Sequence, residues 1–213
     1  MVDENIMTAW RIEGEKVIWQ GFFVEWNNGH LLRQERENIY NLHRWIDTNY
    51  GQKALEVSTK SETKLGVQLS SYSLKKDGVF IENEFQAAKK YENGGPFLDL
   101  LRIKSKEAKR DARHRTSGTL IAYCKNGEEW PIKPSNAFYD YLYISSIIKN
   151  YGVDIDLTEY DWFTDIDYNP RDSIRCQARP IAVYKLLQRM CAFDVINDKD
   201  RWLEFFEQHV WNN

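Results

Sequence analysis

The stretch IENEFQAAKKY, residues 81–91, decides how the centre of this chain is interpreted. As a helix, it would place Glu82, Phe85, Gln86 and Lys89 on one face. A carboxylate, an aromatic ring, an amide and an amine are a poor filling for a core, where Leu, Ile and Val are usual. The face therefore predicts the lining of a pocket, and an ordinary surface helix with solvated charges is the alternative.

The segments before this helix alternate between strand and helix patterns. A turn precedes the helix, and a Gly-Gly-Pro sequence that cannot continue a helix follows it. The predicted elements are a strand at 17–26, an amphipathic helix at 34–50, a strand at 54–59, a second and partly buried strand at 67–74, a turn at 76–78 and the helix end at 94–96.

Local signals after this point predict more helices than strands. The pair Asn126-Gly127 predicts a hairpin, and Pro180 suits the first turn of a helix that runs to about Met190. The other elements are a helix at 107–115 capped by Ser105, a long helix at 136–150, an irregular acidic and aromatic stretch at 160–179, and a last helix capped by Asp198. We predict an α+β fold, mainly helical around short strands. One domain spans residues 51–213, and residues 1–50 form an N-terminal appendage packed on it.

Composition sets limits on the class of protein. Aromatic residues make up 14% of the 213 residues, which is too many for a disordered chain. No apolar run approaches the roughly 20 residues that span a bilayer, and the start MVDENIMTAW lacks a signal-peptide pattern. Three widely spaced cysteines fit a reducing cytosol, so we expect a cytoplasmic protein. Phosphate-loop motifs and metal-ligand spacings are missing, so we expect chemistry without metal or cofactor.

Positive charge is concentrated in the segment at residues 102–115. The chain has a net charge of −3, yet residues 102–115 contain seven Lys or Arg against Glu107 and Asp111. Such a segment suits phosphates, either of a nucleic-acid backbone or of a nucleotide diphosphate. A solvated helix face, with Glu107 beside Arg110, is the alternative.

Four segments together resemble the NADAR superfamily. They lie at 55–74, at 81–91, at 105–115 with 130–143, and at 160–179. The sequence ENEFQAAK is similar to the superfamily's EHxFQAxK helix and departs from it at Asn83 and Glu84. More closely, the chain resembles the NADAR antitoxins paired with DarT-type toxins, which ADP-ribosylate guanine in DNA. The resemblance covers roughly residues 50 to 190.

The resemblance implies hydrolysis of the N-glycosidic bond between ADP-ribose and guanine. A transition state with oxocarbenium character is stabilised by a nearby carboxylate, for which we choose Glu82. Asp165 is a second acid that would activate water or orient the ribose. An amine that attacks the ribose C1 is the other route. Lys60, in the family-like segment STKS, is our first choice for it, with Lys89 and Lys109 as rivals.

The remaining predicted residues would bind substrate. Ser58, Ser70 and Gln177 would hydrogen-bond ribose or phosphate, and Trp162 or Phe163 would stack on adenine or guanine. The full substrate-binding set is Ser58, Ser70, Phe85, Lys89, Lys109, Arg110, Trp162, Phe163, Asn169, Gln177 and Arg179.

The expected partners are guanine-ADP-ribosylated DNA or ADP-ribose, together with a DarT-type toxin. Two other functions stay open: a non-catalytic binder of modified DNA or toxin, and an N-glycosidase that acts on a small ribosylated metabolite.

Overall fold

The strand β9 (Trp162–Thr164) lies at the centre of the sheet that organises one half of the molecule. The computed structural model describes residues 6–27, 29, 31–168 and 175–210. Its four-stranded sheet has the order β2-β1-β9-β3. The partners of β9 are β1 (Ile6–Glu13), which pairs antiparallel to it and to β2 (Lys16–Phe23), and β3 (Ala54–Glu56), which pairs parallel to it.

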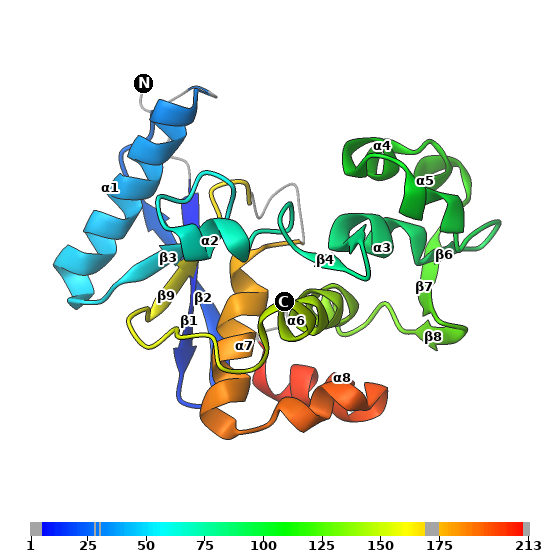
Figure 1. Cartoon of the computed structure of the whole chain (residues 1–213). Coiled ribbons are helices and arrows are strands. Elements are labelled where there is room, and N and C mark those ends of the chain that lie inside the picture. Colours follow the sequence, from blue (N-terminus) through cyan, green and yellow to red (C-terminus); the bar gives the residue numbers. More distant parts are fainter. Residues whose placement is uncertain (1–5, 28, 30, 169–174, 211–213) are drawn as a thin grey trace.

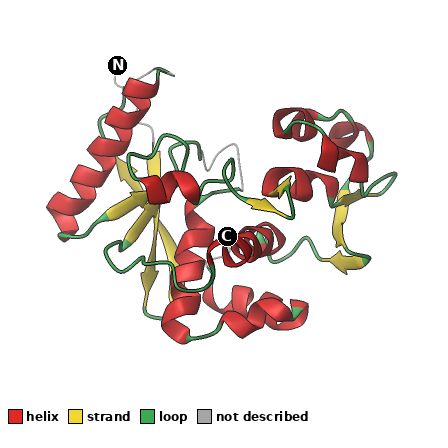
Figure 2. Cartoon of the chain, in the orientation of Figure 1, coloured by secondary structure: helices red, strands yellow, loops and turns green. Residues whose placement is uncertain are grey.

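Helices cover both faces of this sheet (Figures 1 and 2). On one face, Leu42 and Ile46 of α1 (Leu32–Tyr50) pack with Trp162. On the other face, α7 (Ala178–Met190) packs with Phe163 in the main core. Neighbouring residues of a strand point to opposite faces of a sheet, which explains why the sequence pair 162–163 serves both cores. The prediction of an irregular stretch at 160–179 is therefore wrong at β9.

The other half of the molecule is built around a three-stranded sheet of order β6-β7-β8. Figure 1 shows this sheet beside α3, α4 and α5, at the far side of the molecule from α1. Its elements are β6 (Lys89–Tyr91), β7 (Leu120–Lys125), β8 (Glu128–Trp130), α3 (Ile81–Ala87), η1 (Leu98–Arg102), α4 (Ser105–Arg110) and α5 (Arg113–Thr116). The predicted hairpin at Asn126-Gly127 is confirmed by the pairing of β7 with β8.

The helix α6 (Ala137–Tyr151) connects the two halves, because its buried side chains belong to the core that also contains α7 and α3. Below it lie η2 (Phe193–Asn197) and α8 (Lys199–His209), whose predicted Asp198 cap accepts a hydrogen bond from the Arg201 amide at 3.0 Å. The structure confirms an α+β fold. The division that we predicted at residue 50 falls after α1, and the four-stranded sheet contains strands from both sides of it.

Two predicted elements differ in the structure. The expected strand at 67–74 is instead α2 (Lys64–Gln68) followed by a turn, because the Thr63 side chain caps the helix by accepting from the Gly66 amide. The expected helix at 81–91 ends at Ala87. There the chain turns into β6, because β7 supplies a strand partner and the Cys124 amide donates to the Ala88 carbonyl at 2.7 Å. The short hairpin β4 (Lys75–Lys76) and β5 (Val79–Phe80) precedes α3.

Candidate active site

Glu82, Gln86 and Lys89 form a hydrogen-bonded row along one side of α3. Gln86 donates from Nε2 to Glu82 Oε1 at 2.7 Å, and Lys89 donates from Nζ to Gln86 Oε1 at 2.7 Å. The structure thus brings together three residues of the predicted pocket face. Lys89 reaches the row from β6 and not from the helix itself. The row places a carboxylate and an amine on the two sides of one amide.

Arg175, in the segment before α7, completes this group. Its Nη1 atom lies 2.5 Å from Glu82 Oε1, and the two side chains are only 18% and 16% exposed. Partial removal from water strengthens the attraction between opposite charges. Glu82 is therefore held in one position by two donors, from segments 93 residues apart and four residues apart along the chain.

Lys89 has an unusual electrostatic environment. Burial, followed by the positive charges of Arg175 and Lys109, lowers its pKa to about 8, against the opposing effect of Glu82. Its ammonium lies 5.2 Å from the centre of the Phe85 ring, and the Arg175 guanidinium lies 5.4 Å from the same ring. An amine with this pKa is neutral in a useful fraction near pH 7, as nucleophilic and general-base chemistry requires.

The ring of Phe85 lies under the charged groups of Lys89 and Arg175. It is 3% exposed and packs against Tyr123 and Tyr139, with ring centroids 5.3 and 5.2 Å away. Most of the ring therefore contacts the core, and its remaining surface faces the cations. We assign it a supporting role in place of direct substrate binding.

Lys60 forms a second charged group with Asp167 and Glu35, which we call the Lys60 group. Its ammonium donates to Asp167 and lies 3.5 Å from Glu35 Oε1. Burial alone would lower the pKa of Lys60, but the hydrogen bond and charge of Asp167, with Glu35, outweigh burial and raise it. The predicted nucleophile is thus an ion-paired, protonated amine in this structure.

Asp165 is buried, and it stands two residues before Asp167 of the Lys60 group. Its two carboxylate oxygens accept hydrogen bonds from the Gln177 backbone amide at 2.7 Å and side-chain amide at 3.0 Å, and from the Asp167 amide at 3.1 Å. Burial and then the charge of Glu56 raise the pKa of Asp165 to about 8. Gln177 in turn accepts from the Ser71 amide and hydroxyl at 2.8 and 2.9 Å. Asp165 and Gln177 therefore fix the loops around the site.

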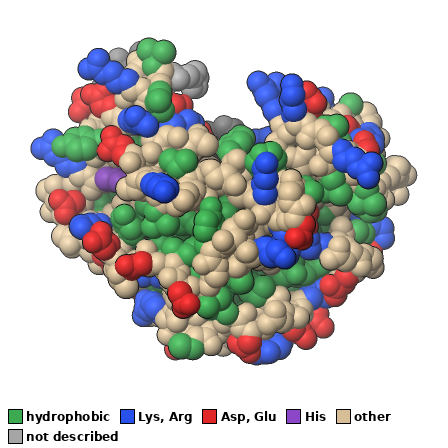
Figure 3. Space-filling model, viewed as in Figure 1, with side chains coloured by type: hydrophobic (Ala, Val, Ile, Leu, Met, Phe, Trp, Pro, Cys, Tyr) green, Lys and Arg blue, Asp and Glu red, His purple; other side chains and the backbone are tan. Residues whose placement is uncertain are grey.

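The basic segment, residues 102–115, lies next to the group formed by Glu82, Gln86, Lys89 and Arg175, which we call the Glu82 group. Lys109 and Arg110 are exposed on α4, and within the described part of the chain neither forms an ion pair. Figure 3 shows Lys and Arg side chains gathered over α4, beside an indentation whose other side is formed by α1. Arg113, by contrast, is bound to Asp99 and Asp111 at 2.6 and 2.8 Å. The helix α4 therefore presents Lys109 and Arg110 as exposed positive charges.

Comparison with known families identifies the chain. The model of the DarT1-associated NADAR antitoxin matches residues 7–213. The chain belongs to this family. Among curated proteins, no sequence matches it. The match extends the resemblance seen in the sequence to nearly the whole chain, including β1, β2 and α1 before it and α8 after it.

Three predicted residues of this NADAR antitoxin are buried away from any surface. Trp162 and Phe163 are 0% exposed and pack on opposite faces of the central sheet, so the predicted stacking role is wrong for them. Arg179 is 3% exposed, and its guanidinium binds the buried Asp140 carboxylate through two contacts of 2.7 Å. Its substrate-binding role is replaced by a link between α6 and α7.

Ser58 and Ser70 also serve the antitoxin's own structure. The Ser58 hydroxyl accepts from the Lys60 amide at 3.1 Å, and the Ser70 hydroxyl donates to the Val67 carbonyl at 2.8 Å. Both side chains are 0% exposed. The predicted contacts to ribose or phosphate are therefore not available to them in this conformation. Asn169 lies outside the described residues.

Sequence reasoning missed two residues of the antitoxin's site, Arg175 and Tyr72. Arg175 was part of the family-like segment 160–179, where it stands two residues before Gln177, and its pairing with Glu82 depends on tertiary structure. Tyr72 was hidden by the wrong strand prediction at 67–74. It directly follows Ser71, whose hydrogen bonds to Gln177 hold this turn two residues along the chain from Arg175.

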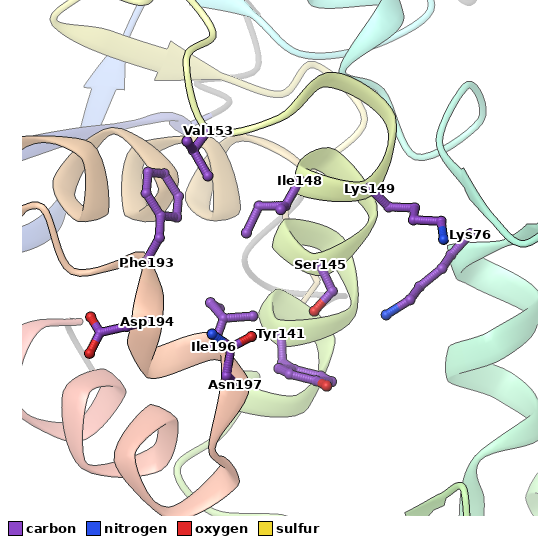
Figure 4. A pocket seen from close by; sticks show the side chains of 10 residues that line it. All are labelled: Lys76, Tyr141, Ser145, Ile148, Lys149, Val153, Phe193, Asp194, Ile196 and Asn197. Carbon is purple, nitrogen blue, oxygen red and sulfur yellow. The ribbon is translucent and has the colours of Figure 1, made fainter.

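A cavity elsewhere on the antitoxin contains none of these side chains. It has a volume of about 660 Å³ and lies between α6 and η2 (Figure 4). Its walls include Tyr141, Ile148 and Phe193, with Lys76 and Lys149 at the rim. Because no residue of the Glu82 or Lys60 group lines it, we do not place the candidate active site there.

Two further observations concern the described residues of the antitoxin. They contain no group of three His, Cys, Asp or Glu side chains arranged to hold a metal ion. Within the same residues, the search for a helix long and apolar enough to cross a membrane finds none.

Proposed function

We propose that this NADAR antitoxin hydrolyses the N-glycosidic bond between ADP-ribose and guanine in DNA and thereby reverses the action of a DarT1-type toxin. The observation that carries the proposal is the Glu82–Gln86–Lys89 row with Arg175 bound to Glu82. The group combines a fixed carboxylate with two cations, which suits a substrate that contains both a reacting ribose and a diphosphate.

The chemistry assigns a separate task to each charge. When the bond between the ribose C1 and the guanine nitrogen breaks, its electron pair leaves with guanine and positive charge develops on the ribose. The Glu82 carboxylate stabilises that charge. Water then gives its hydroxyl to C1 and its proton to guanine, which restores the native base. Arg175, with Lys109 nearby, suits the diphosphate.

The amine route runs through Lys89 in this proposal, in place of Lys60. The Lys89 amine would form a bond to C1 as guanine leaves with the electron pair of the broken bond, and the proton that the amine loses would go to guanine. Water would later give its hydroxyl to C1 and its proton to the Lys89 amine, which releases ADP-ribose. The lowered pKa of Lys89 supports this choice, because only the neutral amine has a free electron pair. The raised pKa of Lys60 disfavours the alternative.

A non-catalytic binder is the second candidate, favoured by the exposed cations on α4. One experiment separates the two. The purified protein is incubated with a guanine-ADP-ribosylated DNA oligonucleotide, and the products are followed by mass spectrometry. Unmodified DNA and free ADP-ribose are the expected products. Intact substrate that co-elutes with the protein would support the binder, and intact substrate without binding would direct the search to small ribosylated metabolites.

A further inference from the structure

The turn between α2 and β4 is held rigidly by its neighbours. The Tyr143 hydroxyl donates to the Leu69 carbonyl at 2.5 Å, and the Leu74 amide donates to the Ser70 carbonyl at 3.0 Å. Ser71 is fixed by its two hydrogen bonds to Gln177. Leu69, Ser70, Ser71 and Leu74 are all buried. The turn is therefore a fixed support between the two halves of the molecule (Figure 1).

Tyr72 is the aromatic residue that this fixed turn presents to solvent. Its side chain is 60% exposed, although Ser71 before it and Leu74 two residues after it are buried. Burial of its hydroxyl end, and then the charges of Asp167 and Glu82, raise the pKa of its phenol, while Lys60 and Arg175 act in the opposite direction. Tyr72 directly follows Ser71, which bonds to Gln177, and Gln177 stands two residues after Arg175, the partner of Glu82. This connection places Tyr72 near the Glu82 group, and the charges that act on its phenol agree with that place.

An exposed aromatic ring on a rigid support is an efficient surface for a flat base. Stacking on such a ring is worth about 1–3 kcal/mol per base, and little entropy is lost because the support is already ordered. We propose that Tyr72 is the platform on which the substrate's guanine stacks while Glu82 acts on the bond between guanine and ribose. This inference rests on the proposed function.

The guanine is the base that the geometry favours over the adenine of ADP-ribose. Guanine is bonded directly to the ribose carbon that reacts, so it must lie next to Glu82 at the moment of cleavage. Adenine is separated from that carbon by two phosphates and a second ribose. Guanine also remains attached to a DNA strand that approaches from solvent, which is the side on which Tyr72 is exposed.

The test measures binding and turnover separately. Equilibrium binding of a guanine-ADP-ribosylated oligonucleotide is followed by fluorescence anisotropy in the Glu82→Gln background, and KM and kcat are measured with Glu82 present. Tyr72→Ala should weaken binding and raise KM by roughly 5- to 150-fold, which corresponds to the stacking of one base. The loss should appear in KM more than in kcat. Tyr72→Phe should restore binding because the ring remains, and Tyr72→Leu should not.

Two controls make the result specific. Tyr40→Ala removes a tyrosine of similar exposure (57%) from α1 and should leave binding unchanged. The affinity for free ADP-ribose should also be unchanged by Tyr72→Ala, because that ligand lacks guanine. Equal binding of the oligonucleotide by Tyr72→Ala and the parent protein would overturn the proposal. An equal loss of affinity for ADP-ribose would overturn it too, because the ring would then hold adenine. If the protein with Glu82 releases no ADP-ribose, the proposed function fails, and the anisotropy measurement still decides the role of Tyr72.

Discussion

Lys60 and Lys89 have the same functional group in opposite environments. Lys60 is paired with Asp167 and Glu35, which keep its amine protonated. Lys89 donates to the neutral Gln86 amide, and burial and nearby cations lower its pKa to about 8. The difference between the two lysines comes from their neighbours, so a sequence pattern alone does not reveal it.

The first prediction compares two conservative variants. Arginine keeps the positive charge but is always protonated. Lys89→Arg should therefore lower the single-turnover rate by at least about 100-fold if the neutral amine takes part in the reaction. Lys60→Arg should retain most activity, because arginine still pairs with carboxylates. Similar rates for the two variants would contradict the assignment.

The pH profile gives a second reading of the same amine. Below its pKa of about 8, the neutral fraction of Lys89 falls tenfold per pH unit, so kcat/KM should rise with pH and level off above about pH 8. If Lys60 were the amine, its raised pKa would let kcat/KM rise across the whole measured range without levelling off. A profile measured from pH 6 to pH 9.5 separates these outcomes.

At the residue scale, the sequence allowed Glu82, Gln86 and Lys89 to be placed together, because their spacing and mixed chemistry are unusual for a core. It did not allow Arg175 to be placed, because its contact with Glu82 joins residues 93 positions apart. It also misplaced Trp162 and Phe163. The acidic residues near them in the sequence suggested an exposed position, but the central sheet buries both rings.

At the scale of elements, Asn83 connects three of them. Its side-chain amide donates to the carbonyls of Leu100 and Ile103 at 2.7 and 2.8 Å, and its oxygen accepts from the Ser105 hydroxyl at 2.5 Å. It is 1% exposed. One buried side chain thus sets how η1 and the basic helix α4 sit against α3. Ser105, which we predicted as a helix cap, acts in this contact instead.

The next prediction concerns this connection. Asn83→Ala leaves the carbonyls of Leu100, which is buried, and of Ile103 without their donor, so it should lower the free energy of unfolding by about 2–4 kcal/mol. Ser105→Ala removes only one contact and should cost about 1 kcal/mol. Urea unfolding followed by circular dichroism measures both values. A cost for Asn83→Ala no larger than that for Ser105→Ala would show that the amide does not fix α4.

Elements with strong local signals were predictable from sequence. The Asn126-Gly127 hairpin, the helix that contains Pro180 and the Asp198 cap all depend on near neighbours. The elements that we predicted wrongly depend on residues that are distant in the sequence. β9 exists because β1 and β3 pair with it, and β6 replaces the last turn of a helix because β7 lies beside it.

At the scale of the whole molecule, positive charge on α4 stands out against a chain of net charge −3. The phosphates of a DNA strand would be attracted to α4. Lys109→Glu with Arg110→Glu should therefore weaken binding of the modified oligonucleotide. The slope of log affinity against log salt concentration should also become shallower by roughly 1–2, because fewer counterions are released.

A matched control places the same two charge reversals elsewhere. Lys16 and Lys53 are exposed on the opposite half of the molecule, and their replacement by Glu changes the net charge equally. An equal effect of the two double variants would mean that net charge, and not the α4 surface, governs binding.

In the proposed reaction, the Glu82 carboxylate stabilises the charge that develops on the ribose as the bond between ADP-ribose and guanine breaks. The most direct measurement is single-turnover release of ADP-ribose from a guanine-modified oligonucleotide by the parent protein, by Glu82→Gln and by Glu84→Gln. Glu84 lies on the same helix and pairs with Lys125, away from the row. We expect that Glu82→Gln still folds and binds but reacts about 100- to 1,000-fold more slowly, while Glu84→Gln reacts normally. Full activity in folded Glu82→Gln would contradict it.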